Sequence, residues 1–375
     1  MLTAAQFDQL SVPITTLYTE FTDSVILDIV RRLKNLDLAS ASWQVQRLSE
    51  SGLVYEQILK RVSKLTGVSE RVLKETFAKA GVKAMKFDDA IYRAAGLAPT
   101  SLKLSPQMLR ILEIGIVLTN SVLRNLTLTT ALAGQDAFIR AADLAYLQIT
   151  SGTFSYQEAI RNAVYSVSRG GLPVITYPSG RQDQIDVAVR RATLTGVGQT
   201  TGQLQIARMN EMGTILVQTS AHIGARNRGE GYENHESWQG RVFSRSPLNT
   251  EYQDFVSTTG LGTVTGLNGV NCRHSFYPFF EGISENAYKA ETLKAYEDKT
   301  VTYNGRELSV YEATQIQRSI ERKIRQAKRD MNALKAVELP YDTELSKLRQ
   351  YQAQMRSFIA QTDLQRQSFR EQVLG

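Results

Sequence analysis

Apolar residues recur at steps of three and four along most of the first 150 residues of the chain. One such series consists of Leu17, Phe21, Val25, Ile29 and Leu33. This spacing places the side chains on one face of an α-helix. The first 150 residues are therefore expected to fold as packed helices.

Glycines and capping residues predict where these helices begin and end. Gly67, Gly81 and Gly96 are expected at helix ends. Ser69 and the pair Ser105-Pro106 are typical of an N-cap and a first-turn proline. Together these signals predict five to seven helices before residue 150.

The segment from 151 to 300 mixes helix and strand signals. Ser155 and Glu158 have the spacing of a capping box, which predicts a helix start. Short runs rich in β-branched residues at 172–177, 214–219 and 241–244 predict strands. The glycine-rich loop at 260–269 is long enough to suggest a specific role.

The last segment begins with a hairpin, because the Asn304-Gly305 pair suits a tight turn that needs positive φ. Two amphipathic helices follow. The predicted class is helix-rich α+β: an N-terminal helical domain (1–150), a central mixed α/β domain with a small sheet and the His/Cys loops (151–300), and a C-terminal hairpin and basic helical arm (301–375).

Composition narrows the classes of protein that the chain can be. Among 375 residues there is one cysteine, so no internal disulfide can form. The N-terminal residues lack the pattern of a secretory signal, and the longest apolar runs are shorter than the ~20 residues of a membrane helix. We expect a soluble protein without membrane contact.

All four histidine and cysteine side chains fall within 53 residues: His222, His235, Cys272 and His274. One thiolate and three imidazoles are acceptable ligands for zinc. The spacing matches no tight metal-binding motif, however, and a lone cysteine beside aromatic residues is commonly a small buried hydrophobe. We expect a packed polar network, with a zinc site and a cysteine nucleophile as the alternatives.

The aromatic residues near this window are expected to anchor it. Trp238 is predicted to be a core anchor for its loop, and Phe276 together with Phe279 or Phe280 is predicted to be buried. Cys272 is expected to face His222 or His235. No metalloprotease, phosphate-binding or serine-hydrolase motif is present in the sequence, so we expect no enzymatic activity.

The net charge of +7 is concentrated near the C-terminus, where residues 318–335 carry seven basic and two acidic side chains. Arg318, Arg322, Arg325 and Arg329 lie at three- and four-residue steps and would share one helix face. Such a face is a candidate for contact with DNA or with an acidic protein, and a face that is only solvated is the alternative.

A series of short blocks follows a fixed order between residues 85 and 330. The blocks are Ala90–Leu97, Asp143–Tyr146, Ser155–Arg161, Tyr177–Gly180, Asp186–Arg191, His222–Arg226, His235–Gly240, Asn271–Pro278, Glu281–Ser284 and Tyr311–Arg318. In this order they resemble the phage minor capsid protein 2 family of tailed bacteriophages. The chain departs from the family at residues 227–234, which separate the two upstream histidines where the family has a short link.

The resemblance implies a structural or accessory protein of the virion. Such a protein would be made in the host cytoplasm, enter the head in several copies and lie at the portal vertex or inner head. Its partners would be the portal or major capsid protein, with packaged DNA as a further contact during assembly or ejection. The alternative function is a metal-assisted hydrolase or toxin-like transferase carried in the head and centred on the His/Cys window.

Overall fold

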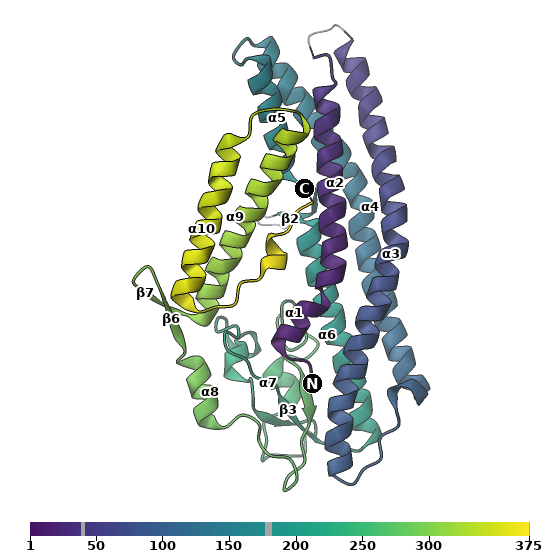
Figure 1. Cartoon of the computed structure of the whole chain (residues 1–375). Coiled ribbons are helices and arrows are strands. Elements are labelled where there is room, and N and C mark those ends of the chain that lie inside the picture. The colour runs from purple at the N-terminus through teal and green to yellow at the C-terminus, as the bar shows by residue number, and fades with distance from the viewer. Residues whose placement is uncertain (39–41, 177–181, 375) are drawn as a thin grey trace. The chain divides into compact units, whose positions relative to one another are not determined.

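The computed structural model describes residues 1–38, 42–176 and 182–374, most of which are helical (Figure 1). The α-helices are α1 (Ala4–Leu10), α2 (Val12–Lys34), α3 (Trp43–Ala94), α4 (Pro106–Thr150), α5 (Tyr156–Gly170), α6 (Ile185–Glu211), α7 (Phe255–Thr259), α8 (Ala290–Glu297), α9 (Val310–Ala336) and α10 (Asp342–Thr362). The strands are β1 (Pro173–Thr176), β2 (Gln182–Gln184), β3 (Leu216–Thr219), β4 (Val242–Ser244), β5 (Phe276–Pro278), β6 (Thr300–Tyr303) and β7 (Arg306–Ser309). The predicted helix-rich α+β class is confirmed.

The chain forms two compact units, each built from three separate segments. Unit 1 consists of Met1–Pro13, Glu70–Ser121 and Arg190–Gln315, and unit 2 consists of Ile14–Ser69, Val122–Val189 and Ile316–Gly375. The organisation into domains 1–150, 151–300 and 301–375 stays a prediction, because compactness of contacts does not measure independent folding.

Helix α3 corrects the expected number of N-terminal helices. It continues through Gly67, Ser69 and Gly81, so the described part of the first 150 residues holds four α-helices instead of five to seven. The Ser69 hydroxyl donates to the Thr66 carbonyl at 3.0 Å inside the helix and caps nothing. A Cβ on Gly81 would lie 3.2 Å from Leu204 Cδ1, so this glycine serves close helix packing.

Local signals at other element boundaries are confirmed. Helix α4 begins at Pro106, and α5 begins with a capping box between Ser155 and Glu158. Asn304 and Gly305 both have positive φ in the β6–β7 turn. The predicted strand at 172–177 corresponds to β1 up to Thr176, and the resemblance block Tyr177–Gly180 lies outside the described residues.

In unit 1 a three-stranded antiparallel sheet has the order β4-β3-β5. Directly opposite residues share a face, so the register places Val217 beside Phe243, and Phe276 opposite Thr219 on the same face. On the other face Tyr277 donates its hydroxyl hydrogen to Gln218 Oε1 at 3.0 Å. The first face is the apolar one and belongs to the core.

Helices α4 and α6 approach closely in unit 1. A Cβ on Gly115 would lie 2.0 Å from Thr200 Oγ1, and one on Gly196 would lie 2.1 Å from Thr119 Oγ1. Both glycines are therefore required by the short distance between the helices.

The opposite side of α4 is apolar and exposed. We call three of its residues in unit 1 the α4 stripe: Ile114, Val117 and Leu118. At 3.6 residues per turn they lie within about 100° around the helix. Each is 45–63% exposed. Among the described residues, α4 is the one helix long and apolar enough to cross a membrane by length and composition alone.

Unit 2 contains most of α9 and all of α10, which lie next to each other as a helical hairpin (Figure 1). The C-terminal segment contacts both the α9–α10 hairpin and α2. Gln317 donates to the Gln365 carbonyl at 2.9 Å, and the Leu374 amide donates to Asp23 Oδ2 at 2.9 Å. The predicted pair of closing helices is confirmed.

Candidate functional site

The four histidine and cysteine residues lie together in unit 1, on loops around the β4-β3-β5 sheet. His222 follows β3, His235 begins a short 3-10 turn, and Cys272 and His274 precede β5. The rings of His222 and His274 stack with centroids 4.4 Å apart, and those of His235 and His274 lie 5.3 Å apart. The longer loop at 227–234 therefore does not separate the histidines in space.

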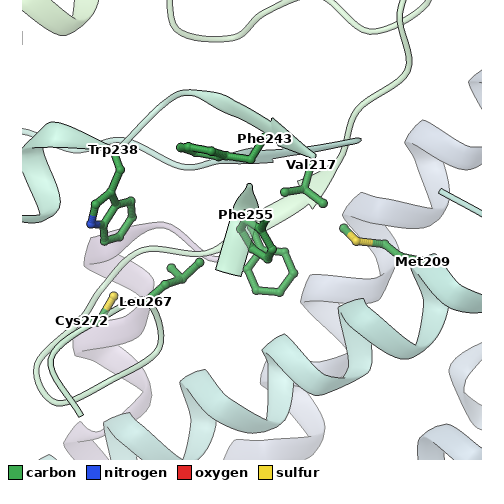
Figure 2. Packing of buried hydrophobic residues seen from close by; sticks show 8 residues of the cluster. Met209, Val217, Trp238, Phe243, Phe255, Leu267 and Cys272 are labelled. Atoms are coloured by element: carbon green, nitrogen blue, oxygen red, sulfur yellow. The ribbon is translucent and has the colours of Figure 1, made fainter. Parts of the chain in front are cut away.

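One apolar core supports this cluster (Figure 2). It consists of Met209, Val217, Trp238, Phe243, Phe255, Leu267, Cys272 and Phe276. In Figure 2 Cys272 and Leu267 lie on a loop near Trp238, whereas Met209 lies at the other end of the cluster. Trp238 is fully buried, and its ring centroid lies 4.8 Å from those of both His235 and His274.

Hydrogen bonds determine the tautomer of His274. Gln239 Oε1 accepts from the backbone N–H of His222 at 3.0 Å, which fixes the orientation of the Gln239 amide. His274 Nε2 lies 3.1 Å from the same oxygen and must donate to it. In the neutral ring the lone pair is therefore on Nδ1, which lies 3.7 Å from Cys272 Sγ.

His235 has the same tautomer for a similar reason. Its Nε2 lies 2.7 Å from the Thr265 carbonyl oxygen, which can only accept. Arg226 donates to this carbonyl at 3.0 Å and to the Val270 carbonyl at 2.9 Å. The Nδ1 of the neutral His235 ring therefore also carries a lone pair.

One ligand atom from each of His235, Cys272 and His274 can be chosen so that all three lie within 4.8 Å of one another. All three residues are buried. His222 lies outside this set and has its Nδ1 3.1 Å from the Ile223 carbonyl, to which it donates. The arrangement offers a metal two neutral imidazoles and one sulfur.

Burial keeps these groups uncharged. It lowers the pKa of His235 to about 4 and the pKa of His274 well below its usual value, and it also lowers the pKa of His222. Burial raises the pKa of the Cys272 thiol. A protonated, buried thiol is a poor nucleophile, so the arrangement does not favour covalent catalysis.

The structure corrects one expected anchor. Trp238 and Phe276 are fully buried, but Phe279 and Phe280 are both only half-buried. The buried ring beside Phe276 is Tyr277, which packs edge-on against Phe87 at 5.3 Å. Phe279 and Phe280 follow the end of β5, where the alternation of the strand no longer fixes which residues face the core.

The expected basic face of α9 is also corrected. Arg329 is buried, with its Nε 2.7 Å from Asp23 Oδ1, and Arg325 donates to the Arg370 carbonyl at 2.7 Å. Arg318 is half-buried, and Arg322 is exposed. Steps of three and four residues place the four side chains on one face of α9, but other parts of unit 2 pack against part of that face. The four arginines therefore do not form one surface for DNA.

Unit 1 also contains a cavity of about 550 Å³ between α4, α6 and the glycine-rich loop. Its lining residues are amides, aliphatic side chains and glycines: Gln107, Ile111, Gln199, Gly202, Gln203, Ile206, Ala207, Asn210, Leu261, Gly262, Leu267 and Asn268. None of them titrates, so the cavity supplies no acid, base or nucleophile.

Three functional partners of the cluster are absent from the sequence-based set: Arg226, Gln239 and Thr265. Arg226 and Gln239 lie inside the resemblance blocks His222–Arg226 and His235–Gly240. Their membership of these blocks is the signal that could have indicated a role. Thr265 contributes through its backbone carbonyl, and side-chain identity gives no indication of that role.

The described residues therefore define a helix-rich protein whose histidines and cysteine are part of a packed core. The chain belongs to the phage minor capsid protein 2 family, which matches residues 2–360. It is 23% identical over 351 residues to a structural protein of Lactococcus phage LL-H, with 88% of each chain covered. It is 32% identical over 120 residues to a structural protein of Lactococcus phage mv4, covering 30% of this chain and 86% of that one.

No solved structure matches the chain. The family resemblance found in the sequence is confirmed. The chain is accordingly a phage structural protein, and its place is the virion.

Proposed function

We propose that this minor capsid protein docks at the portal vertex on the inner side of the phage head, and that the α4 stripe forms the contact with the portal protein. The observation that carries the proposal is a row of exposed apolar side chains in a protein of a virion-structural family. Rows of this kind mark protein or membrane contact sites.

Packing on the other side of α4 supports a protein partner over a bilayer. In unit 1 Gly115 is in tight contact with Thr200. In unit 2 the hydroxyl groups of Thr127 and Tyr18 lie 3.2 Å apart. One face of α4 thus packs inside the protein and the other is exposed, as expected of a helix that docks onto a partner protein.

The test introduces charge into the stripe with Val117→Lys and Leu118→Lys together. Their side chains are 60% and 63% exposed, so folding should be retained, measured by circular dichroism and melting temperature. The matched control is Val45→Lys with Leu48→Lys, on α3, where the exposed fractions are 70% and 62%.

A phage lacking its own copy of the protein is complemented with each form, and copies per purified virion are counted by quantitative mass spectrometry. We expect several copies per virion for the wild type and the control, and at least a tenfold loss for the stripe variant. Purified portal protein should capture the wild type and the control but not the stripe variant. Unchanged incorporation of the stripe variant contradicts the proposal. A membrane role is indicated instead if the wild type binds phosphatidylcholine vesicles, the stripe variant does not, and both are incorporated equally.

For packaged DNA, the part of α9 that supports contact is narrower than the four arginines expected from the sequence. Arg322 is exposed, whereas Arg325 and Arg329 are held by internal partners. We propose weak, sequence-independent contact through Arg322, which fits a protein inside a DNA-filled head.

The alternative of a metal-assisted hydrolase or toxin-like transferase gains no support from the described residues. Cys272, His235 and His274 are buried, and the cavity in unit 1 is lined by residues that do not titrate. We therefore do not propose an enzymatic function.

A further inference from the structure

We propose that His235, Cys272 and His274 bind one Zn²⁺ ion, which cross-links the loop before β5 to the 3-10 turn at His235. This role is separate from docking at the portal. It concerns how the core of unit 1 is held together.

Geometry is the first support. In a tetrahedral zinc site with bonds of about 2.3 Å to sulfur and 2.0–2.1 Å to nitrogen, a sulfur and a nitrogen ligand lie roughly 3.6 Å apart. Cys272 Sγ and His274 Nδ1 are 3.7 Å apart. A ring nitrogen of His235 lies within 4.8 Å of the two other ligand atoms, so a shift of roughly 1.5 Å or less would complete the set.

The outer hydrogen bonds are the second support. Ligating histidines typically donate their other ring N–H to a carbonyl or carboxylate, which fixes the tautomer and the ring orientation. His274 donates to Gln239 Oε1, and His235 donates to the Thr265 carbonyl. Binding through Nδ1 of both rings would keep these hydrogen bonds.

The chemistry of the set selects zinc among the common divalent ions. One thiolate and two imidazoles are soft or borderline ligands, whereas Mg²⁺ and Ca²⁺ prefer oxygen. Binding replaces the Cys272 S–H bond with a Zn–S bond and releases one proton to solvent. His222 is not one of the proposed ligands, because its Nδ1 donates to the Ile223 carbonyl and it lies outside the set.

The test uses the full chain, purified and equilibrated with Zn²⁺, followed by dialysis and elemental analysis. We expect one zinc per chain in the wild type and at least a tenfold loss of bound zinc in Cys272→Ser, His235→Ala and His274→Ala. His222→Ala is the matched control, because it removes a neighbouring ring of the same type and should retain the metal.

Val217→Ala separates loss of ligand from loss of packing. Val217 is fully buried in the same core but offers no ligand, so this variant should be less stable and still bind one zinc. Replacement of zinc by Co²⁺ in the wild type should give a thiolate-to-cobalt charge-transfer band, a readout that requires no variant.

A chelator should lower the melting temperature of the wild type and leave that of Cys272→Ser unchanged, and added Zn²⁺ should restore the wild type. The absence of stoichiometric zinc and of the cobalt band in the folded wild type overturns the proposal. Retention of zinc by Cys272→Ser, or its loss from His222→Ala, overturns the three-ligand assignment.

Discussion

The side chain of Asp88 lies in a buried environment that disfavours its charged form. It is fully buried on α3, and its Oδ2 accepts from Gln205 Nε2 at 3.0 Å, while its Oδ1 has no hydrogen-bond partner in the part of the chain that the structure describes. Burial raises its pKa to about 7, against the opposing effect of the Gln205 hydrogen bond. A pKa raised in the folded state means that Asp88 stabilises the fold when protonated, below about pH 4, and that this contribution is lost as the pH rises through 7.

Asp88→Asn should therefore change the pH dependence of stability. The amide keeps an acceptor for Gln205 and cannot ionise. The difference in free energy of unfolding between variant and wild type should move in favour of the variant by up to about 4 kcal/mol from pH 4 to above pH 7. Urea denaturation across this range measures it. Asp136→Asn, at an exposed position, is the control, and a difference that does not vary with pH would refute the assignment.

Phe276 and Phe279 allow a direct comparison of a buried and a half-buried ring in the same segment. Phe276 is fully buried and packs edge-on against Phe255, with centroids 5.0 Å apart. Phe276→Ala should lower the free energy of unfolding by about 3–5 kcal/mol. Phe279→Ala should cost clearly less, because part of its surface already contacts water. Denaturant midpoints of the two variants measure the difference, and equal losses would count against the assigned burial.

At the scale of residues, the sequence predicts rare side chains well and common ones poorly. His222, His235, Cys272 and His274 stand out because the chain has no other histidine or cysteine. Gln239 does not stand out, because glutamine is common and its role comes from the position of the chain around it. Contacts made by backbone carbonyls leave no trace in residue type.

At the scale of elements, α9 changes in character along its length. Arg329 lies 2.7 Å from Asp23 and 3.8 Å from Asp186, and all three are buried. Burial raises the pKa of Asp23, and the charge of Arg329 opposes that shift. Arg329 is therefore part of the core of unit 2, whereas Arg322, two turns earlier on α9, is exposed.

The difference in burial between Arg329 and Arg322 predicts different effects when each is replaced by alanine. Arg329→Ala should lower the free energy of unfolding by about 3–5 kcal/mol, because it leaves two buried carboxyl groups without their cation. Arg322→Ala should leave stability unchanged and reduce the slope of log DNA affinity against log salt by about 0.9. Denaturation and DNA binding at several salt concentrations measure the two effects. A stable Arg329→Ala variant, or an unchanged salt slope for Arg322→Ala, would contradict the respective half of the prediction.

Helix boundaries show why element prediction succeeds in some places and fails in others. The start of α5 depends on atoms of Ser155 and Glu158, which are neighbours in sequence, so the pattern is sufficient. Gly81 lies inside α3 because Leu204, more than a hundred residues away, leaves little room for a side chain. A glycine that ends a helix and one that permits close packing look the same in a sequence.

At the scale of the whole molecule, the class and the family could be predicted from the sequence, but the composition of the two units could not. The spacing of apolar residues predicts the helices, and the order of the short sequence blocks indicates the family. Which segments assemble together depends on contacts between positions as distant as Asp23 and Leu374. No local pattern encodes such pairs.

The interleaving of the two units also imposes an order in time. Residues 14–69 belong to a unit that includes Ile316–Gly375, so they leave the ribosome about 300 residues before their last partners. At about 5–20 residues per second this is a wait of roughly 15–60 s. During it the apolar faces of α2 and of the first part of α3 have none of their C-terminal partners to cover them. Unit 2 therefore cannot be completed until the segment Ile316–Gly375 has left the ribosome, and until then these apolar faces depend on the segments made earlier to cover them.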